Sequence, residues 1–361
     1  MKAHEPAATI PAPELPYQPE LPPDYRPAIG LIGCGGITVE HLQAYRDAGL
    51  NVVALCDLDV ARATERQGQF YPDATVYADY RELLARDEIE VVDVATHPAQ
   101  RVAIVEAALY AGKHVLSQKP FVLDLDEGQR LVELADRRQR QLAVNQNGRW
   151  APHFSYARQA IQAGLLGTVA AVHLSVHWDH TWVAGTEFEN IKHLVLYDFA
   201  IHWFDIAHAF LGGRPARKVY ATTARWPGQT LMPPLLAEAM IEYDDAQASL
   251  VFDAATPFGQ EDSTYVAGTQ GTLRSVGPDL FEQTLTLTTS AGAATPKLEG
   301  RWFPDGFRGT MGELLRSIAE GREPVISGRR NLDSLAICFA AVASAESGQP
   351  VVPGSVRRMT E

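Results

Sequence analysis

The chain has 361 residues, 46% of them hydrophobic, which is more than one core usually organises and predicts two domains. Its formal net charge of −13, without any block of Lys and Arg residues, argues against a nucleic-acid partner. Three cysteines without CxxC spacing argue against a disulfide framework or a structural zinc site, and no run of about eighteen apolar residues offers a membrane span, so we expect a cytoplasmic protein.

Residues 1–27 form a proline-rich arm with few large aliphatic side chains. This composition favours extended chain over a packed element. Two interpretations stay open: a disordered tail, or an arm that lies on a surface and wraps a neighbouring subunit.

Residues 28–148 alternate between short apolar runs and helical patterns. Strands are expected at 28–32, 52–56, 91–95, 114–116 and 142–144, with helices at 39–48, 60–70, 99–111 and 126–137 between them. This alternation predicts an α/β Rossmann domain, a doubly wound parallel sheet that binds a dinucleotide.

A glycine-rich turn separates the first strand from the first helix. Gly33, Gly35 and Gly36 permit a tight bend and let backbone N–H groups, with that of Ile37, approach a pyrophosphate at the helix N-terminus. Thr38 stands where the strict GxGxxG pattern has its third glycine. The turn therefore predicts a dinucleotide site within a βαβ unit.

Asp57 ends the second strand, about twenty residues beyond the glycines. A carboxylate there accepts hydrogen bonds from the adenosine ribose hydroxyls and repels a 2′-phosphate. NAD is therefore favoured over NADP, with nearby Arg62 as the residue that would instead favour NADP.

Residues 149–361 change to an α+β pattern. Strands are expected near 168–178, 217–225, 237–243, 247–254, 263–267, 271–275 and 282–288, with helices at 152–163, 306–320 and 329–346. They predict a C-terminal domain with an open, mostly antiparallel β-sheet covered by helices on one face. We expect this domain, C-terminal helices included, to bind substrate and to join subunits into a homodimer or homotetramer.

Two segments carry groups suited to alcohol oxidation. Lys119 follows the strand at 114–116, at the sheet edge where ligands bind. In a helix, Asp198, His202 and Asp205 would share one face. Histidine can remove a hydroxyl proton near neutral pH, and a lysine can polarise the oxygen. The alternative interpretation of the second segment is a buried structural His–Asp pair.

These motifs together resemble the glucose-fructose oxidoreductase/inositol dehydrogenase family, also called Gfo/Idh/MocA. The matching pieces are Gly33-Cys34-Gly35-Gly36-Ile37, Ala111-Gly112-Lys113-His114-Val115-Leu116 leading to Gln118-Lys119-Pro120, and Asp198-x-Ala200-x-His202-x-x-Asp205. The resemblance covers about residues 28–355. It implies Lys119, Asp198 and His202 as the catalytic set, with His202 accepting the proton, Lys119 polarising the oxygen and Asp198 orienting substrate or base. Asp205 would support the fold.

The resemblance also implies contacts around the cofactor and the substrate. Cofactor contacts are expected from Thr96, His97, Gln118, Asn145 and Gln146, and substrate contacts from Arg149 and Trp150. Gln118 replaces the family's glutamate, and Arg101 stands where the family has a later histidine. His97 is alternatively a plain loop residue.

Aromatic and polar residues cluster at 177–182. Trp178 and His180 suit the apolar faces and the hydroxyls of a sugar ring. The alternative is that these aromatic residues only pack against the sheet. His173, His177 and His180 are not expected to bind a metal.

The leading function is a sugar or polyol dehydrogenase, which passes hydride from a ring carbinol of a sugar, glycoside or cyclitol to NAD. Two alternatives stay open: an NAD-dependent glycoside hydrolase that oxidises a ring carbon transiently, and a non-catalytic NAD-binding protein. The retained Lys119, Asp198 and His202 argue against the last.

Overall fold

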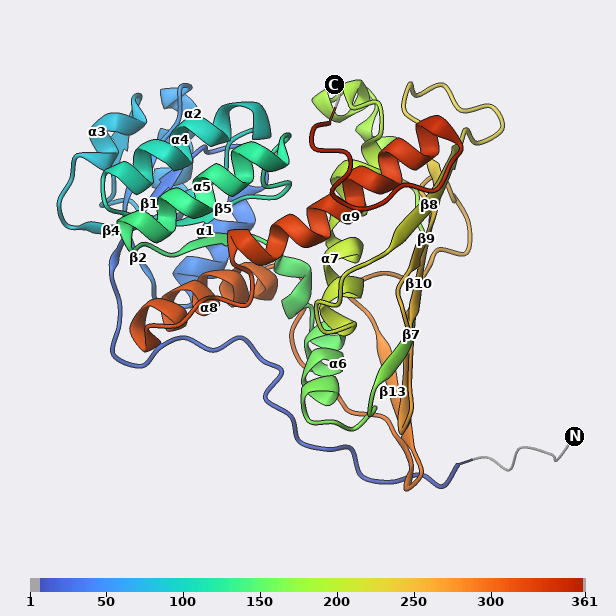
Figure 1. The fold of residues 1–361 in the computed structure, drawn as a ribbon. Helices are drawn as coiled ribbons and strands as arrows, with labels where there is room; N and C mark the ends of the chain where they lie inside the picture. Colours follow the sequence, from blue (N-terminus) through green and yellow to red (C-terminus); the bar gives the residue numbers. More distant parts are fainter. Residues whose placement is uncertain (1–6, 360–361) are drawn as a thin grey trace, which may run out of the picture.

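The computed structural model describes residues 7–359, which form two sheets with helices packed between and around them (Figure 1). No helix in this part of the chain is long and apolar enough to cross a membrane.

The first sheet is a Rossmann sheet of six parallel strands. Its order, β3-β2-β1-β4-β5-β6, confirms the predicted doubly wound topology. The central strands are buried on both faces, because helices cover both sides of the sheet. The strands are β1 (Ala28–Ile32), β2 (Asn51–Cys56), β3 (Thr75–Tyr77), β4 (Ile89–Val94), β5 (His114–Ser117) and β6 (Leu142–Val144). The helices between them are α1 (Thr38–Asp47), α2 (Val60–Phe70), α3 (Tyr80–Leu84), α4 (Pro98–Tyr110) and α5 (Leu125–Arg138).

The second sheet has eight strands in the order β14-β13-β12-β11-β7-β10-β9-β8. Only the β7–β10 pair is parallel, which confirms the expected open, mostly antiparallel sheet. Figure 1 shows the sheet edge-on, with α6 (Pro152–Gln162), α7 (Ile201–Phe210) and α9 (Gly328–Ser347) on the face toward the Rossmann domain. The strands are β7 (Val169–His177), β8 (Lys218–Ala224), β9 (Leu236–Glu242), β10 (Gln247–Asp253), β11 (Glu261–Gly268), β12 (Gly271–Gly277), β13 (Thr284–Thr289) and β14 (Gly292–Ala294).

Helix α8 (Asp305–Glu320) packs with the Rossmann domain, although the sequence grouped it with the second domain. Phe307, Met311 and Leu314 lie in one core cluster with Leu31 of β1 and Leu42 of α1. The expected boundary at residue 149 therefore does not describe this packing. The apolar stripe of α8 predicts that one face of the helix is buried, but it does not predict which sheet covers that face.

The proline-rich arm lies against its own chain. The backbones of residues 8–10 and Ala293 of β14 are hydrogen-bonded, and the Tyr17 ring meets Tyr156 of α6 edge-on at 5.9 Å. Further on, Glu20 pairs with Arg316 of α8 at 2.5 Å. Residues 7–27 thus cross both domains before entering β1 (Figure 1), and are not the tail that one interpretation expected.

Candidate active site

The glycine turn has the shape that a bound phosphate needs. Gly33 has φ +93°, and a Cβ there would lie 2.9 Å from the Ala95 backbone, so a side chain does not fit. At Gly35 and Gly36 a Cβ would meet nothing within 4 Å, which leaves open space above the turn at the start of α1. Ile37, 39% exposed, closes this turn.

Asp57 is fixed at the end of β2 by the turn itself. Its Oδ2 accepts a hydrogen bond from the backbone N–H of Cys34 at 2.7 Å, and its Oδ1 accepts one from Asp59 at 2.8 Å. Arg62 lies 3.9 Å from the same carboxylate. The acidic group expected at the ribose is thus held beside the glycine turn.

Lys119 and Asp198 meet across the two domains. Lys119 follows β5, and its Nζ donates to the backbone carbonyl of Asp198 at 2.9 Å and lies 3.2 Å from the Asp198 carboxylate. Asp198 belongs to a π-helical turn, η4 (Val195–Phe199), so the expected single helix is broken before α7 begins. The break lets Asp198 face Lys119 while His202 continues in α7.

His202 is 7% exposed, and its ring lies edge-on to Trp302 at 5.4 Å. Burial, with the nearby Lys119 ammonium as the second cause, lowers the pKa of His202 well below its ordinary value. The imidazole is therefore neutral at pH 7 and able to accept a proton.

Several buried polar atoms near these strand ends have no hydrogen-bond partner among residues 7–359. They are Thr96 Oγ1, both amide atoms of Gln146 and Nδ1 of His202. Buried polar groups are normally satisfied, so these four atoms are available to a polar ligand. Together with the open glycine turn, they fit a dinucleotide that runs from α1 toward Lys119.

Of the other residues expected to contact the cofactor, one is exposed and two face a buried histidine. His97 is exposed at the start of α4. Gln118 and Asn145 are buried, and both amides face the ring of His41 at 3.0 and 3.3 Å. Sequence reasoning missed His41. Fully buried Arg101 donates to the carbonyls of Thr96 and Pro120, and so joins the loops that follow β4 and β5.

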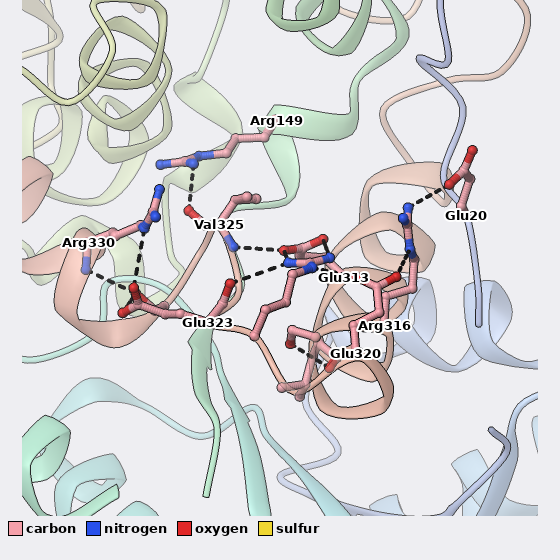
Figure 2. Close-up of polar contacts among 12 residues, drawn as sticks. Glu20, Arg149, Glu313, Arg316, Glu320, Glu323, Val325 and Arg330 are labelled. Carbon is pink, nitrogen blue, oxygen red and sulfur yellow. Dashed lines mark hydrogen bonds and ion pairs between the residues drawn. The ribbon is translucent and has the colours of Figure 1, made fainter. Parts of the chain in front are cut away.

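Arg149 is held inside the protein. Its guanidinium forms a two-point pair with Asp205, at 2.6 and 2.8 Å, and donates to the carbonyl of Val325 at 2.9 Å. Figure 2 shows the Val325 contact beside the Glu313 carboxylate, which accepts from the Val325 N–H. A substrate would have to compete with these bonds, so the geometry favours a structural role for Arg149.

Trp150 is 6% exposed and packs in the core beneath α8, with the Arg158 guanidinium 5.4 Å from its ring. Its position therefore also favours packing over contact with a substrate.

Trp178 and His180 form one wall of a small apolar cavity. Their rings stack at 5.1 Å with 15° between the planes, and His180 also packs on Phe199 at 4.5 Å. Burial lowers the pKa of His180 to about 4. Because Phe199 directly follows Asp198, this aromatic wall continues from the Lys119–Asp198 contact.

Comparison with known proteins agrees with this arrangement. Residues 28–146 match the family model described as the oxidoreductase family with an NAD-binding Rossmann fold, and residues 154–274 match the GFO/IDH/MocA C-terminal domain. A D-apiose dehydrogenase of Paraburkholderia graminis is 30% identical over 332 residues, which cover 89% of this chain and 88% of that protein. A myo-inositol dehydrogenase of Streptomyces leeuwenhoekii is 30% identical over 348 residues, covering 90% and 99%.

Among solved structures, levoglucosan dehydrogenase in complex with NADH and levoglucosan has the same fold. It superposes with a TM-score of 0.80 at 20% identity, covering 92% of this chain and all of that one (100%). The two family models, the Rossmann and open-sheet topology and the Gln118-Lys119-Pro120 and Asp198-to-His202 segments agree, and the chain belongs to the Gfo/Idh/MocA family of oxidoreductases.

Proposed function

We propose that this protein is an NAD-dependent dehydrogenase that oxidises a ring carbinol of a sugar, glycoside or cyclitol. The observation that carries the proposal is the contact of the Lys119 ammonium with Asp198 where the domains join, beside a His202 imidazole whose pKa burial and this ammonium lower. Relatives named as apiose and inositol dehydrogenases support this substrate class.

Each side chain has a separate task in this proposal. His202 takes the hydroxyl proton, since its imidazole is neutral at pH 7. Lys119 donates hydrogen bonds to the same oxygen as negative charge develops on it. Asp198 holds the ammonium in place through its carbonyl and carboxylate. The bound NAD supplies the acceptor for the hydride that leaves the carbon.

The preference for NAD over NADP follows in this proposal from Asp57. Its carboxylate lies beside the glycine turn and would accept from the ribose hydroxyls. A 2′-phosphate there would meet a negative charge that Arg62, at 3.9 Å and largely exposed, offsets only in part.

The test is NADH absorbance with purified protein across free sugars, inositols and glycosides, after mass analysis of small molecules carried through purification. Net formation of NADH with a ring alcohol supports the proposal. Release of an aglycone without net NADH would assign a hydrolase instead, and NAD binding without any turnover would assign a non-catalytic role.

A further inference from the structure

A fully buried imidazole lies beneath the strand end that carries Lys119. His41 comes from α1 and is 0% exposed, with the Phe307 ring of α8 packed on it at 4.4 Å. Its Nδ1 is 2.7 Å from Oδ2 of Asp93 in β4, and the same oxygen accepts from the Tyr45 hydroxyl at 2.6 Å. Its Nε2 faces the amides of Gln118 and Asn145.

The partners determine which ring nitrogen of His41 carries the proton. Oε1 of Gln118 accepts from the backbone N–H of Lys119 at 2.7 Å, so the Gln118 NH₂ group must face His41. A carboxylate can only accept at the other side of the ring. Nδ1 of His41 therefore donates to Asp93, and Nε2 accepts from Gln118.

Asn145, the residue directly after β6, joins the same network. Its Nδ2 is 3.3 Å from Nε2 of His41, and its Oδ1 accepts from the Thr310 hydroxyl of α8 at 2.9 Å. One imidazole thus orients amides at two neighbouring strand ends. Gln118 in turn holds the backbone of the residue whose ammonium reaches Asp198.

We propose that His41 is a positioning residue for Lys119: its neutral ring, anchored by Asp93, fixes the Gln118 amide, which holds the Lys119 backbone for its contact with Asp198. This inference rests on the proposed dehydrogenase function for its kinetic part only. The protonation state of His41 is measurable without any substrate.

The charged and titratable groups around the ring define what a charge at position 118 would do. Asp93 faces Nδ1 and also accepts from the Tyr45 hydroxyl, the side chains on Nε2 are neutral amides, and α8 contributes Phe307 and Thr310. Burial and the Asp93 carboxylate keep the Tyr45 pKa well above its ordinary value, so Tyr45 stays a donor. The interaction between Arg101 and Asp93 is an electrostatic attraction through space.

The first experiment is NMR of the full-length protein with ¹⁵N-labelled histidine, with the His41 signal assigned by its loss in His41→Gln. At pH 7 the wild-type ring should show one protonated nitrogen, Nδ1. In Gln118→Glu a carboxylate oxygen would face the Nε2 lone pair, so His41 should take up a proton and show both nitrogens protonated. A neutral ring in Gln118→Glu, or an Nε2–H ring in the wild type, would overturn the inference.

The second experiment measures kcat and KM on a confirmed sugar or cyclitol. Gln118→Met keeps the length of the side chain but removes both hydrogen bonds, and small misplacements of a reacting group cost up to about 100-fold in rate. We expect kcat to fall by about 10- to 100-fold, with the KM for the sugar changed by less than about threefold. Gln67→Met is the matched control, because Gln67 donates only to the Ala74 carbonyl in the same domain.

The proposed function and the positioning role of His41 can each be contradicted without the other. A wild type without turnover on any sugar contradicts the proposed function and leaves the NMR result to decide the inference. Active Gln118→Met with unchanged kcat, or an equal loss in Gln67→Met, contradicts the positioning role even where the dehydrogenase function holds.

Discussion

The ammonium of Lys119 lies 2.9 Å from the backbone carbonyl of Asp198 and 3.2 Å from its carboxylate, although 79 residues separate the two along the chain. The contact joins the end of β5 in one domain to the π-helical turn in the other. The lysine is thereby held where the domains meet, and its partner Asp198 stands four residues before His202 in the chain.

Replacement of His202 tests the proton acceptor. His202→Ala should lower kcat by about 10²- to 10⁴-fold, the usual cost of losing a general base, while the Kd of NADH changes little. Lys119→Ala should be comparably damaging, because the developing alkoxide loses its cation. His114→Ala, at the opposite end of β5 from Lys119, is the control for histidine loss. If the variants of both residues fold and keep more than half of the wild-type turnover, this site is not the catalytic site.

Asp57→Ser should narrow the preference for NAD over NADP, since it removes both the ribose acceptors and the repelling charge. Calorimetric Kd values for both dinucleotides provide the measurement, and we expect the ratio of the Kd for NADP to the Kd for NAD to fall at least about tenfold. Asp59→Ser is a matched control because Asp59 caps α2 instead. Tighter binding of NADP than NAD by the wild type would refute the assignment.

The uncovered face of the second sheet predicts self-association. Across this face, Tyr220, Met240, Ser249, His173, Tyr265 and Arg274 stand in one cross-strand row. Tyr220, Met240 and Tyr265 are 40%, 55% and 42% exposed. A face with such apolar groups is expected to be covered by a second copy of the chain.

Light scattering at micromolar concentration should give the mass of a dimer or tetramer. Met240→Asp should lower that mass, because it places a charge between Tyr220 and Ser249 in the row. Tyr110→Asp, at a 55% exposed position on α4, should leave the mass unchanged. A monomeric wild type would contradict the prediction.

Asp262 predicts a dependence of stability on pH. Burial, followed by repulsion from Asp279, raises the pKa of its carboxyl to about 8, far above its value in the unfolded chain. Between about pH 4 and pH 8 the folded state keeps a proton that the unfolded state has lost, so this group lowers stability as pH rises. The substitution Asp262→Asn removes this contribution of the carboxyl to the pH dependence of stability.

We therefore expect Asp262→Asn to raise Tm relative to wild type by roughly 3 °C or more at pH 8, with the difference shrinking toward pH 5. Thermal unfolding followed by circular dichroism measures it. Asp279→Asn provides a comparison in which the buried carboxyl itself is retained. An equal effect of Asp262→Asn at both pH values would contradict the raised pKa.

The sequence predicted the elements whose signals are local. Buried parallel strands appear as short apolar runs, and the outer strands alternate, as β9 does between buried and exposed positions. The short strand β3 and the helix α3, of three and five residues, escaped notice because neither spans enough residues to show a period. The glycine turn and Lys119 were found because their chemistry follows directly from strand ends.

Pairings between distant segments were not predictable in the same way. Arg149 looked available to a substrate, but its partner Asp205 lies 56 residues away and only the folded chain brings them together. His41 carries no local signal, since one polar partner lies in β4 and the other two directly follow β5 and β6. The docking of α8 and of the arm likewise depends on surfaces formed elsewhere in the chain.

The arm has a consequence for the order of events during synthesis. Residues 7–27 leave the ribosome before any other described segment, yet they dock on α6, on β14 and on α8, whose Arg316 is made some 300 residues later. This arm therefore has no complete binding surface until α8 has emerged. The strands β1 to β6 leave the ribosome well before α8 does, so they are free to assemble before the arm can complete its contacts.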